Sequence, residues 1–391
     1  MKVLIGALGV SKYDGTRYKF ENGEEFEADL FLYALARHIE PDRVIAIVTE
    51  EAEQKTLPYL QEWMNLDSIP LTAVRIPNGA TSSEAWDIFN KIEAKFTELL
   101  QQSEASLEVF IDITYGFRSI PILFLSIARY LQRTKDVQLG GIFYGAYDAV
   151  PRDQNLKPVY KLDSFITVLD WATAVDTFRK TGSSVQLADM LDIYGVDFEL
   201  PVMQKVAQAL RELSQALDLV RIEDAHQSAY NLIEAVKAAT PEAVRESDRL
   251  ILELLKQLSD EFEIIALASP RKDIRRFIKA NLELVFWYHD RNRYQDAMLV
   301  AREWMISYKM FNPQFRKRAY KNEEFFDYEV RREEENPAGW KIPERKKLAV
   351  EISELRNSLA HGGLSRDADA ADMLSRIEKV MSDLRKIKVL L

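Results

Sequence analysis

The stretch that decides the fold is LEVFIDITYGFRSIP, residues Leu107–Pro121. A β-rich apolar run ends at Thr114, Gly116 allows a tight turn, and Ser119 with Pro121 begins a helix. A strand that turns tightly into a helix is typical of a parallel α/β sheet. The free backbone N–H groups at such a helix start, together with Arg118, would bind phosphate or another anion. A capped turn without a ligand explains the same residues equally well.

Further strands and helices alternate on both sides of this stretch. Apolar β-rich runs lie at Val3–Leu8, Val44–Thr49, Leu71–Ile76 and Leu139–Tyr144, and helix-length segments span roughly 25–40, 51–65, 81–102 and 119–134. This alternation predicts a Rossmann-like parallel sheet with helices on both faces. Ligands of such sheets lie beyond the carboxyl ends of the strands. The residues expected to line that site are Gly9, Ser11, Asn78, Gly79, Thr81, Thr114, Tyr115, Gly116, Phe117 and Arg118. A dinucleotide is disfavoured, because Gly6-Ala7-Leu8-Gly9 does not match G-x-G-x-x-G.

The second half of the chain is predicted to be all-α. Beyond about residue 160 the apolar residues recur at helical spacing, and glycine or proline separates the segments. We therefore expect an α/β domain at 1–160, a helical connector at 161–280 and a helical domain at 281–391. The fold class is α/β followed by all-α.

A second motif, LRNSLAHGG, occupies residues 355–363. An apolar stripe runs along the same predicted helix, at Leu348, Ile352, Leu355 and Leu359. Asn357 and His361 fall opposite this stripe and Arg356 on its flank, with His361 in the last turn before two glycines. A second Arg-x4-His pair, Arg221 and His226, is interpreted as a chance match, because acidic residues flank it and no amide or glycine accompanies it.

Arginine, an amide and a titratable histidine on one surface suit metal-free RNA cleavage. The 2′-hydroxyl of the RNA attacks the adjacent phosphate, so histidine need only transfer protons and arginine balance charge. The alternative is an ordinary solvent-facing cap residue. Cysteine is absent and the other histidines are scattered singly, so we expect neither a metal nor a cofactor.

Composition narrows the class of protein further. The 391 residues are 47% hydrophobic and 29% charged, as in ordinary globular proteins, and the net charge of −10 argues against nonspecific coating of nucleic acid. The apolar N-terminus is too short for a signal peptide, and no stretch is long enough to span a membrane. A cytoplasmic location is expected.

Together the two motifs resemble the CRISPR-associated CARF–HEPN ribonucleases of type III systems. DITYGFRSIP at 112–121 is similar to the strand–loop signature of the CARF sensor, and LRNSLAHGG to the Arg-x4-6-His element of the HEPN nuclease. The segments 169–182 and 294–304 resemble the connector helix and the opening HEPN helix. Tyr115 stands where the sensor motif would carry histidine.

This resemblance implies a function for each half. The sensor would bind a cyclic oligoadenylate, which would activate single-strand RNA endoribonuclease activity in CRISPR antiviral defence. Arg356 and His361 would be catalytic, Asn357 would orient them, and the products would carry 2′,3′-cyclic phosphates. A homodimer or higher oligomer is implied. Because each chain offers one suitable histidine, His361, and cleavage needs one group to accept a proton and one to donate it, we also expect a nuclease site that two chains share. A ligand-sensing regulator with a silent helical domain, and a sensor that degrades its own messenger, remain as alternatives.

Overall fold

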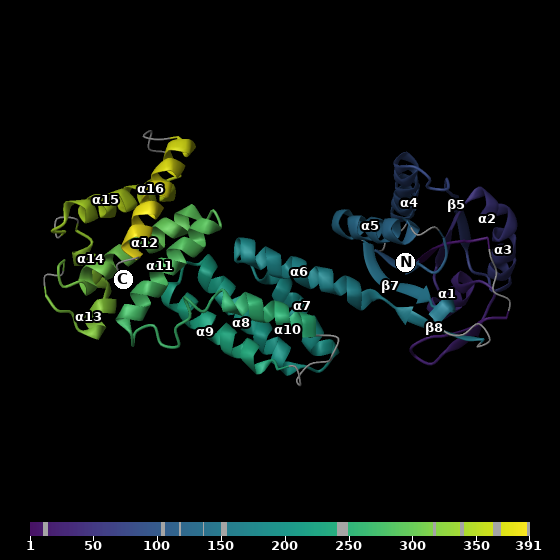
Figure 1. Ribbon diagram of the computed structural model, residues 1–391, viewed down its shortest axis with the longest axis horizontal. Helices are drawn as coiled ribbons and strands as arrows, with labels where there is room; N and C mark the ends of the chain where they lie inside the picture. The colour runs from purple at the N-terminus through teal and green to yellow at the C-terminus, as the bar shows by residue number, and fades with distance from the viewer. Residues whose placement is uncertain are drawn as a thin grey trace. The chain divides into compact units, whose positions relative to one another are not determined.

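A computed structural model gives the structure of the chain as two compact units, Met1–Thr167 and Val168–Leu391 (Figure 1). It describes residues 1–10, 15–102, 106–116, 119–135, 137–149, 155–240, 249–315, 318–336, 340–362 and 369–388. Each unit has its own apolar core, and each is therefore taken by itself below.

An eight-stranded mixed sheet forms the centre of the first unit. Its strands are β1 (Lys2–Ala7), β2 (Arg17–Lys19), β3 (Glu25–Glu27), β4 (Arg43–Val48), β5 (Leu71–Arg75), β6 (Leu107–Asp112), β7 (Val137–Gly145) and β8 (Leu156–Lys161). The order across the sheet is β3-β2-β8-β7-β6-β1-β4-β5. Neighbours from β7 to β5 are parallel, whereas β8 runs antiparallel to β7. The expected Rossmann-like sheet is confirmed.

Helices cover both faces of this sheet. They are α1 (Phe31–Ile39), α2 (Glu50–Lys55), α3 (Leu57–Leu66), α4 (Ser82–Gln102) and α5 (Ser119–Thr134), with a short 3-10 turn at Tyr147–Ala149. Apolar residues of α1 and α3 share one core with one face of the sheet. Those of α4 and α5 share a second core with the opposite face. Both faces of β1, β4 and β6 are thus buried, which explains their nearly continuous apolar sequences.

Two expected helices differ from the structure. Residues 25–27 of the segment expected to be helical form β3, which pairs with β2 across a turn at Asn22-Gly23. Asn-Gly is a frequent hairpin turn, and Gly23 has φ +89°. The segment 51–65 is two helices, because the chain breaks at Thr56 and α3 restarts with Pro58 in its first turn.

The second unit is all-α, as expected. After α6 (Asp163–Thr181), which begins just before the boundary, its helices are α7 (Val185–Asp197), α8 (Pro201–Asp218), α9 (Ile222–Ala238), α10 (Arg249–Asp260), α11 (Ile274–Asp290), α12 (Tyr294–Phe311), α13 (Asn322–Phe326), α14 (Tyr328–Glu334), α15 (Pro343–Ala360) and α16 (Ala370–Lys388). One apolar core runs from Trp171 to Ile387. The further division at residue 280 falls within α11 and stays a prediction. Among the described residues, no helix combines the length and apolar character needed to cross a membrane.

Candidate functional site

The carboxyl ends of β1 and β6 form the first candidate site. These strands are parallel neighbours, with Gly6 opposite Asp112. From β1 the chain proceeds to β4 and β5 on one side, and from β6 to β7 on the other. The order of the strands therefore reverses between β1 and β6. Open α/β sheets bind their ligands outside the strand ends at such a reversal.

A cavity of about 300 Å³ lies at this reversal. Three of its lining residues were expected from the sequence, namely Gly9, Asn78 and Gly116. Thr49 and Glu51 also line it and were not expected. They follow β4, and Thr49 caps α2 by accepting the N–H of Ala52. Thr49 falls in the expected strand run Val44–Thr49, but the position of ligands beyond the carboxyl ends of parallel strands could have indicated both residues.

Gly116 fixes the wall of this cavity beside β1. Its φ of +107° lies in a region that residues with a side chain rarely adopt. A Cβ at this position would lie 2.9 Å from the Cβ of Ala7. Glycine therefore lets the loop after β6 pack directly against the end of β1.

Other predicted residues hold the loops together. The Thr114 hydroxyl accepts the N–H of Gly145 at 2.8 Å, and the Tyr115 hydroxyl lies 3.3 Å from that of Tyr18. Thr81 accepts the N–H of Glu84 at the start of α4. Gly79 has φ +71°, and a Cβ there would lie 3.9 Å from the Ser119 hydroxyl. The remaining predicted ligand residues, Ser11, Phe117 and Arg118, lie outside the described residues.

Asp112, at the end of β6, is a fully buried carboxyl group. Its Oδ1 accepts the N–H of Thr114 at 2.7 Å, whereas no hydrogen bond reaches Oδ2 from the described residues. Burial raises the pKa of Asp112 to about 7, although the hydrogen bond from Thr114 opposes this. The carboxyl group shapes the turn that leads to Gly116, and its charge is energetically costly.

We expect Asp112→Asn to stabilise the protein relative to wild type as the pH rises from 5 to 8. The folded-state pKa lies above the ordinary value near 3.9, so the folded state binds the extra proton in this range. Stability of wild type therefore falls as the pH rises through about 7. The asparagine oxygen can still accept the Thr114 N–H. Thermal unfolding at several pH values measures the difference, with Asp87→Asn, at an exposed carboxylate, as control. Parallel pH profiles for Asp112→Asn and wild type would contradict this expectation.

The second candidate site lies at the end of α15. Leu348, Ile352 and Leu355 are buried, which confirms the apolar stripe. Arg356 is half-buried, and its Nη1 donates to Asn357 Oδ1 at 2.8 Å. The Nε of Arg356 is buried and has no hydrogen-bond partner among the described residues.

His361 follows the last residue of this helix. It is exposed, as is Asn357, and its N–H donates to the carbonyl oxygen of Asn357 at 3.0 Å. Gly362 has φ +64° and ends the helix. Arg356, Asn357 and His361 thus share one end of α15, where the half-buried guanidinium is hydrogen-bonded to Asn357 and the imidazole is open to solvent.

His226, in the other Arg-x4-His pair, belongs to the core. Its side chain is buried, with Nδ1 2.7 Å from the carbonyl oxygen of Ile265 and Nε2 2.7 Å from Oδ1 of Asn281. Burial lowers the pKa of His226. This histidine connects α9 to α11 and is not accessible to an RNA chain.

In comparisons with known proteins, two separate parts of the chain match different families, one in each structural unit. Residues 3–148 match the family described as CRISPR system endoribonuclease Csx1, CARF domain. Residues 167–269 match the second domain of CRISPR-associated protein MJ1674. The whole chain is 21% identical to CRISPR-associated protein MJ1674 from Methanocaldococcus jannaschii over 456 aligned positions, and it spans 66% of the length of that protein.

One solved structure that matches the chain is Enterococcus italicus Csm6 bound to cyclic hexa-2′-fluoro-hexa-dAMP. The alignment covers 100% of this chain and 94% of that one, with a TM-score of 0.44 and 13% identity.

Proposed function

We propose that this chain, a CRISPR-associated protein whose N-terminal part is a CARF domain, binds a cyclic oligoadenylate and in response cleaves single-stranded RNA. The messenger would occupy the cavity at the carboxyl ends of β1 and β6. The end of α15, with Arg356, Asn357 and His361, would cleave the RNA. The observation that carries the proposal is the cavity at the strand reversal of a matched CARF domain.

The cavity suits part of a cyclic oligonucleotide. The backbone of Gly9 and Gly116 and the amide of Asn78 offer uncharged polar groups to a phosphodiester or a base. Its volume of about 300 Å³ is at the lower end of ligand sites. One chain would therefore hold one portion of the ring, and a two-fold related copy would hold the rest. A homodimer accordingly forms part of the proposal.

Cleavage at the end of α15 requires only proton transfer and charge balance. The 2′-oxygen loses its proton and bonds to phosphorus, the bond from phosphorus to the 5′-oxygen breaks, and that oxygen gains a proton. His361 transfers protons, and Arg356 balances the charge on the phosphate oxygens. Asn357 accepts a hydrogen bond from Arg356 and so orients the guanidinium. The products end in 2′,3′-cyclic phosphates.

We expect two chains to share the nuclease site, because the reaction transfers two protons. The step needs one group that accepts a proton and one that donates a proton. Among the described residues of one chain, His361 is the histidine at the end of α15, whereas His226 and His289 lie within the helical core. A second copy of His361 from a two-fold partner would supply the other group.

Incubation of the purified chain with a fluorescent single-stranded RNA, with and without cyclic oligoadenylates of three to six nucleotides, tests the proposal. We expect cleavage that depends on one ring size, persists in EDTA and yields 2′,3′-cyclic phosphate ends. The linear oligoadenylate of the same length is the matched control. Cleavage that no ring increases would refute the sensor, and absence of cleavage, with ring binding detected by isothermal titration, would refute the nuclease and support the sensor.

A further inference from the structure

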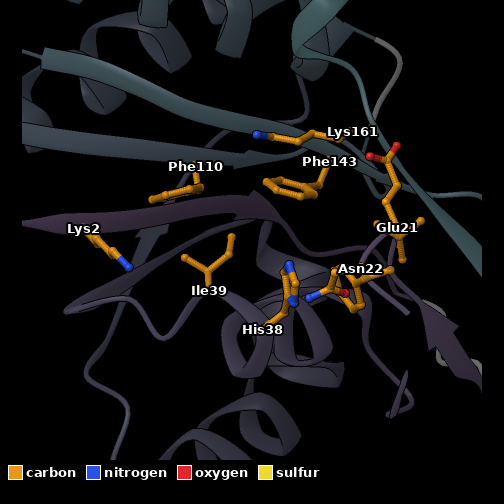
Figure 2. A pocket seen from close by; sticks show the side chains of 10 residues that line it. Lys2, Glu21, Asn22, His38, Ile39, Phe110, Phe143 and Lys161 are labelled. Atoms are coloured by element: carbon orange, nitrogen blue, oxygen red, sulfur yellow. The ribbon is translucent and has the colours of Figure 1, made fainter. Parts of the chain in front are cut away.

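A second hollow of the first unit lies away from the strand-end cavity, on the face of the sheet that α1 covers. Its volume is about 370 Å³. Lys2, the first residue of β1, lines it, so it opens near the amino-terminal ends of the parallel strands. The rings of Phe110 and Phe143 and the side chain of Ile39 form its apolar wall (Figure 2). The two cavities share no lining residue, so a ligand here would not occupy the messenger site.

Two glycines leave room for the aromatic wall. The register between β6 and β7 shifts between Val109 and Phe110: Val109 pairs with Leu139 and Phe110 with Gly141, so Gly140 is the extra residue. A Cβ at Gly140 would lie 2.5 Å from the Phe110 ring, and a Cβ at Gly141 would lie 2.6 Å from the Phe143 ring. Larger residues at these positions would displace both rings. The consecutive glycines within an otherwise apolar strand therefore allow this aromatic wall.

The polar groups of the hollow are two lysines and a histidine. In Figure 2 the side chains of Lys2 and Lys161 approach Phe110 from opposite sides. The ammonium group of Lys2 has no ion pair among the described residues, whereas Lys161 Nζ lies 2.8 Å from Asp163. His38 stacks on Phe20 with ring centroids 3.9 Å apart.

Carboxylates near the hollow are mostly paired. Glu24 Oε2 lies 2.7 Å from Nδ1 of His38 and also accepts the Asn22 amide, and Asp163 pairs with Lys161. Glu21 lies at the rim. Hydrogen bonds from Asn22 and His38 lower the pKa of Glu24. Asp42 accepts the backbone N–H of Lys2 at 2.7 Å, whereas the Lys2 ammonium group has no carboxylate partner among the described residues and is the group that an anion would contact.

We propose that this hollow binds a flat aromatic ring that carries one anionic group, at the size of a mononucleotide. The ring stacks against Phe143, Phe110 and the imidazole of His38, and the anionic group contacts the ammonium group of Lys2. Stacked and edge-to-face aromatic rings stabilise a complex beyond the burial of their apolar surface. Ammonium–phosphate contacts are strong because both groups are charged.

Isothermal titration of the full chain tests this inference with three probes. Adenosine 5′-monophosphate carries the ring and the anion, adenosine lacks the anion, and ribose 5-phosphate lacks the ring. We expect the monophosphate to bind most tightly. Lys2→Gln should weaken its binding about tenfold, the size expected for loss of one charge-assisted hydrogen bond, and should not change adenosine binding. Lys91→Gln, on α4 at the opposite face, is the matched control.

Two further variants locate the bound probe. Gly141→Ala, which pushes the Phe143 ring into the hollow, should abolish binding of both adenosine probes, and a thermal melt verifies that this variant folds. Asn78→Ala, in the strand-end cavity, should not change binding. Unchanged affinity in Lys2→Gln would overturn the inference, as would loss of binding in Asn78→Ala or no binding of the monophosphate at millimolar concentration.

Discussion

Replacement of His361 with alanine is expected to lower the rate of messenger-activated RNA cleavage by about 10²–10⁴-fold, the contribution of a positioned proton-transfer group. His361 is exposed and lies beyond the last turn of α15, so the change removes no core contact. Arg356 and Asn357 keep their hydrogen bond in the variant. RNA should therefore still bind while the transfer of the 2′-hydroxyl proton slows.

The measurement is single-turnover cleavage of labelled RNA at saturating messenger. Ala360→Ser, at the adjacent exposed residue, is the matched control and should retain wild-type activity. EDTA should leave the wild-type rate unchanged. If EDTA removes activity and magnesium restores it, the metal-free mechanism is wrong. A His361→Ala rate within a few-fold of wild type would place the chemistry elsewhere in the chain.

The strands of the parallel sheet could be predicted because their sequences carry a strong signal. The runs at Val3–Leu8 and Val44–Thr49 become β1 and β4, which are buried on both faces and therefore consist almost wholly of apolar residues. In contrast, β2 and β3 have three residues each with polar ends. Such short strands acquire their structure from their neighbours in the sheet, although Asn22-Gly23 between Tyr18 and Phe26 was a hairpin signal.

The position of the strand-end cavity could be predicted from the sequence, whereas the hydrogen bonds around it could not. Parallel strands end at the same edge of a sheet, so the loops containing Gly9, Asn78 and Gly116 had to meet there. The hydrogen bond from the Gly145 N–H to the Thr114 hydroxyl forms because β7 lies beside β6. The local sequence does not show which strand is the neighbour of β6. The hollow near Lys2 combines residues from separate strands, α1 and the β2–β3 turn, and no local pattern joins them.

The remaining large effect is expected at Gly116, where a single methyl group should raise the concentration of messenger that activation requires. In Gly116→Ala the new Cβ would meet Ala7 at 2.9 Å, and the backbone would be strained at φ +107°. Backbone strain of this kind costs about 1–3 kcal/mol, which the loop can relieve by moving away from β1. Such a movement would change the shape of the cavity that Gly116 lines.

A strain of about 1–3 kcal/mol corresponds to roughly a fivefold to 150-fold change in an equilibrium constant, so the messenger concentration at half-maximal RNA cleavage should rise by up to that factor. The cleavage rate at saturating messenger should stay close to wild type, since the end of α15 is unchanged. Gly23→Ala is the matched control: φ is +89° there, but no atom lies within 4 Å of the added Cβ. Its activation curve should overlay that of wild type. If the activation curve of Gly116→Ala also coincides with that of wild type, the loop after β6 does not bind the messenger.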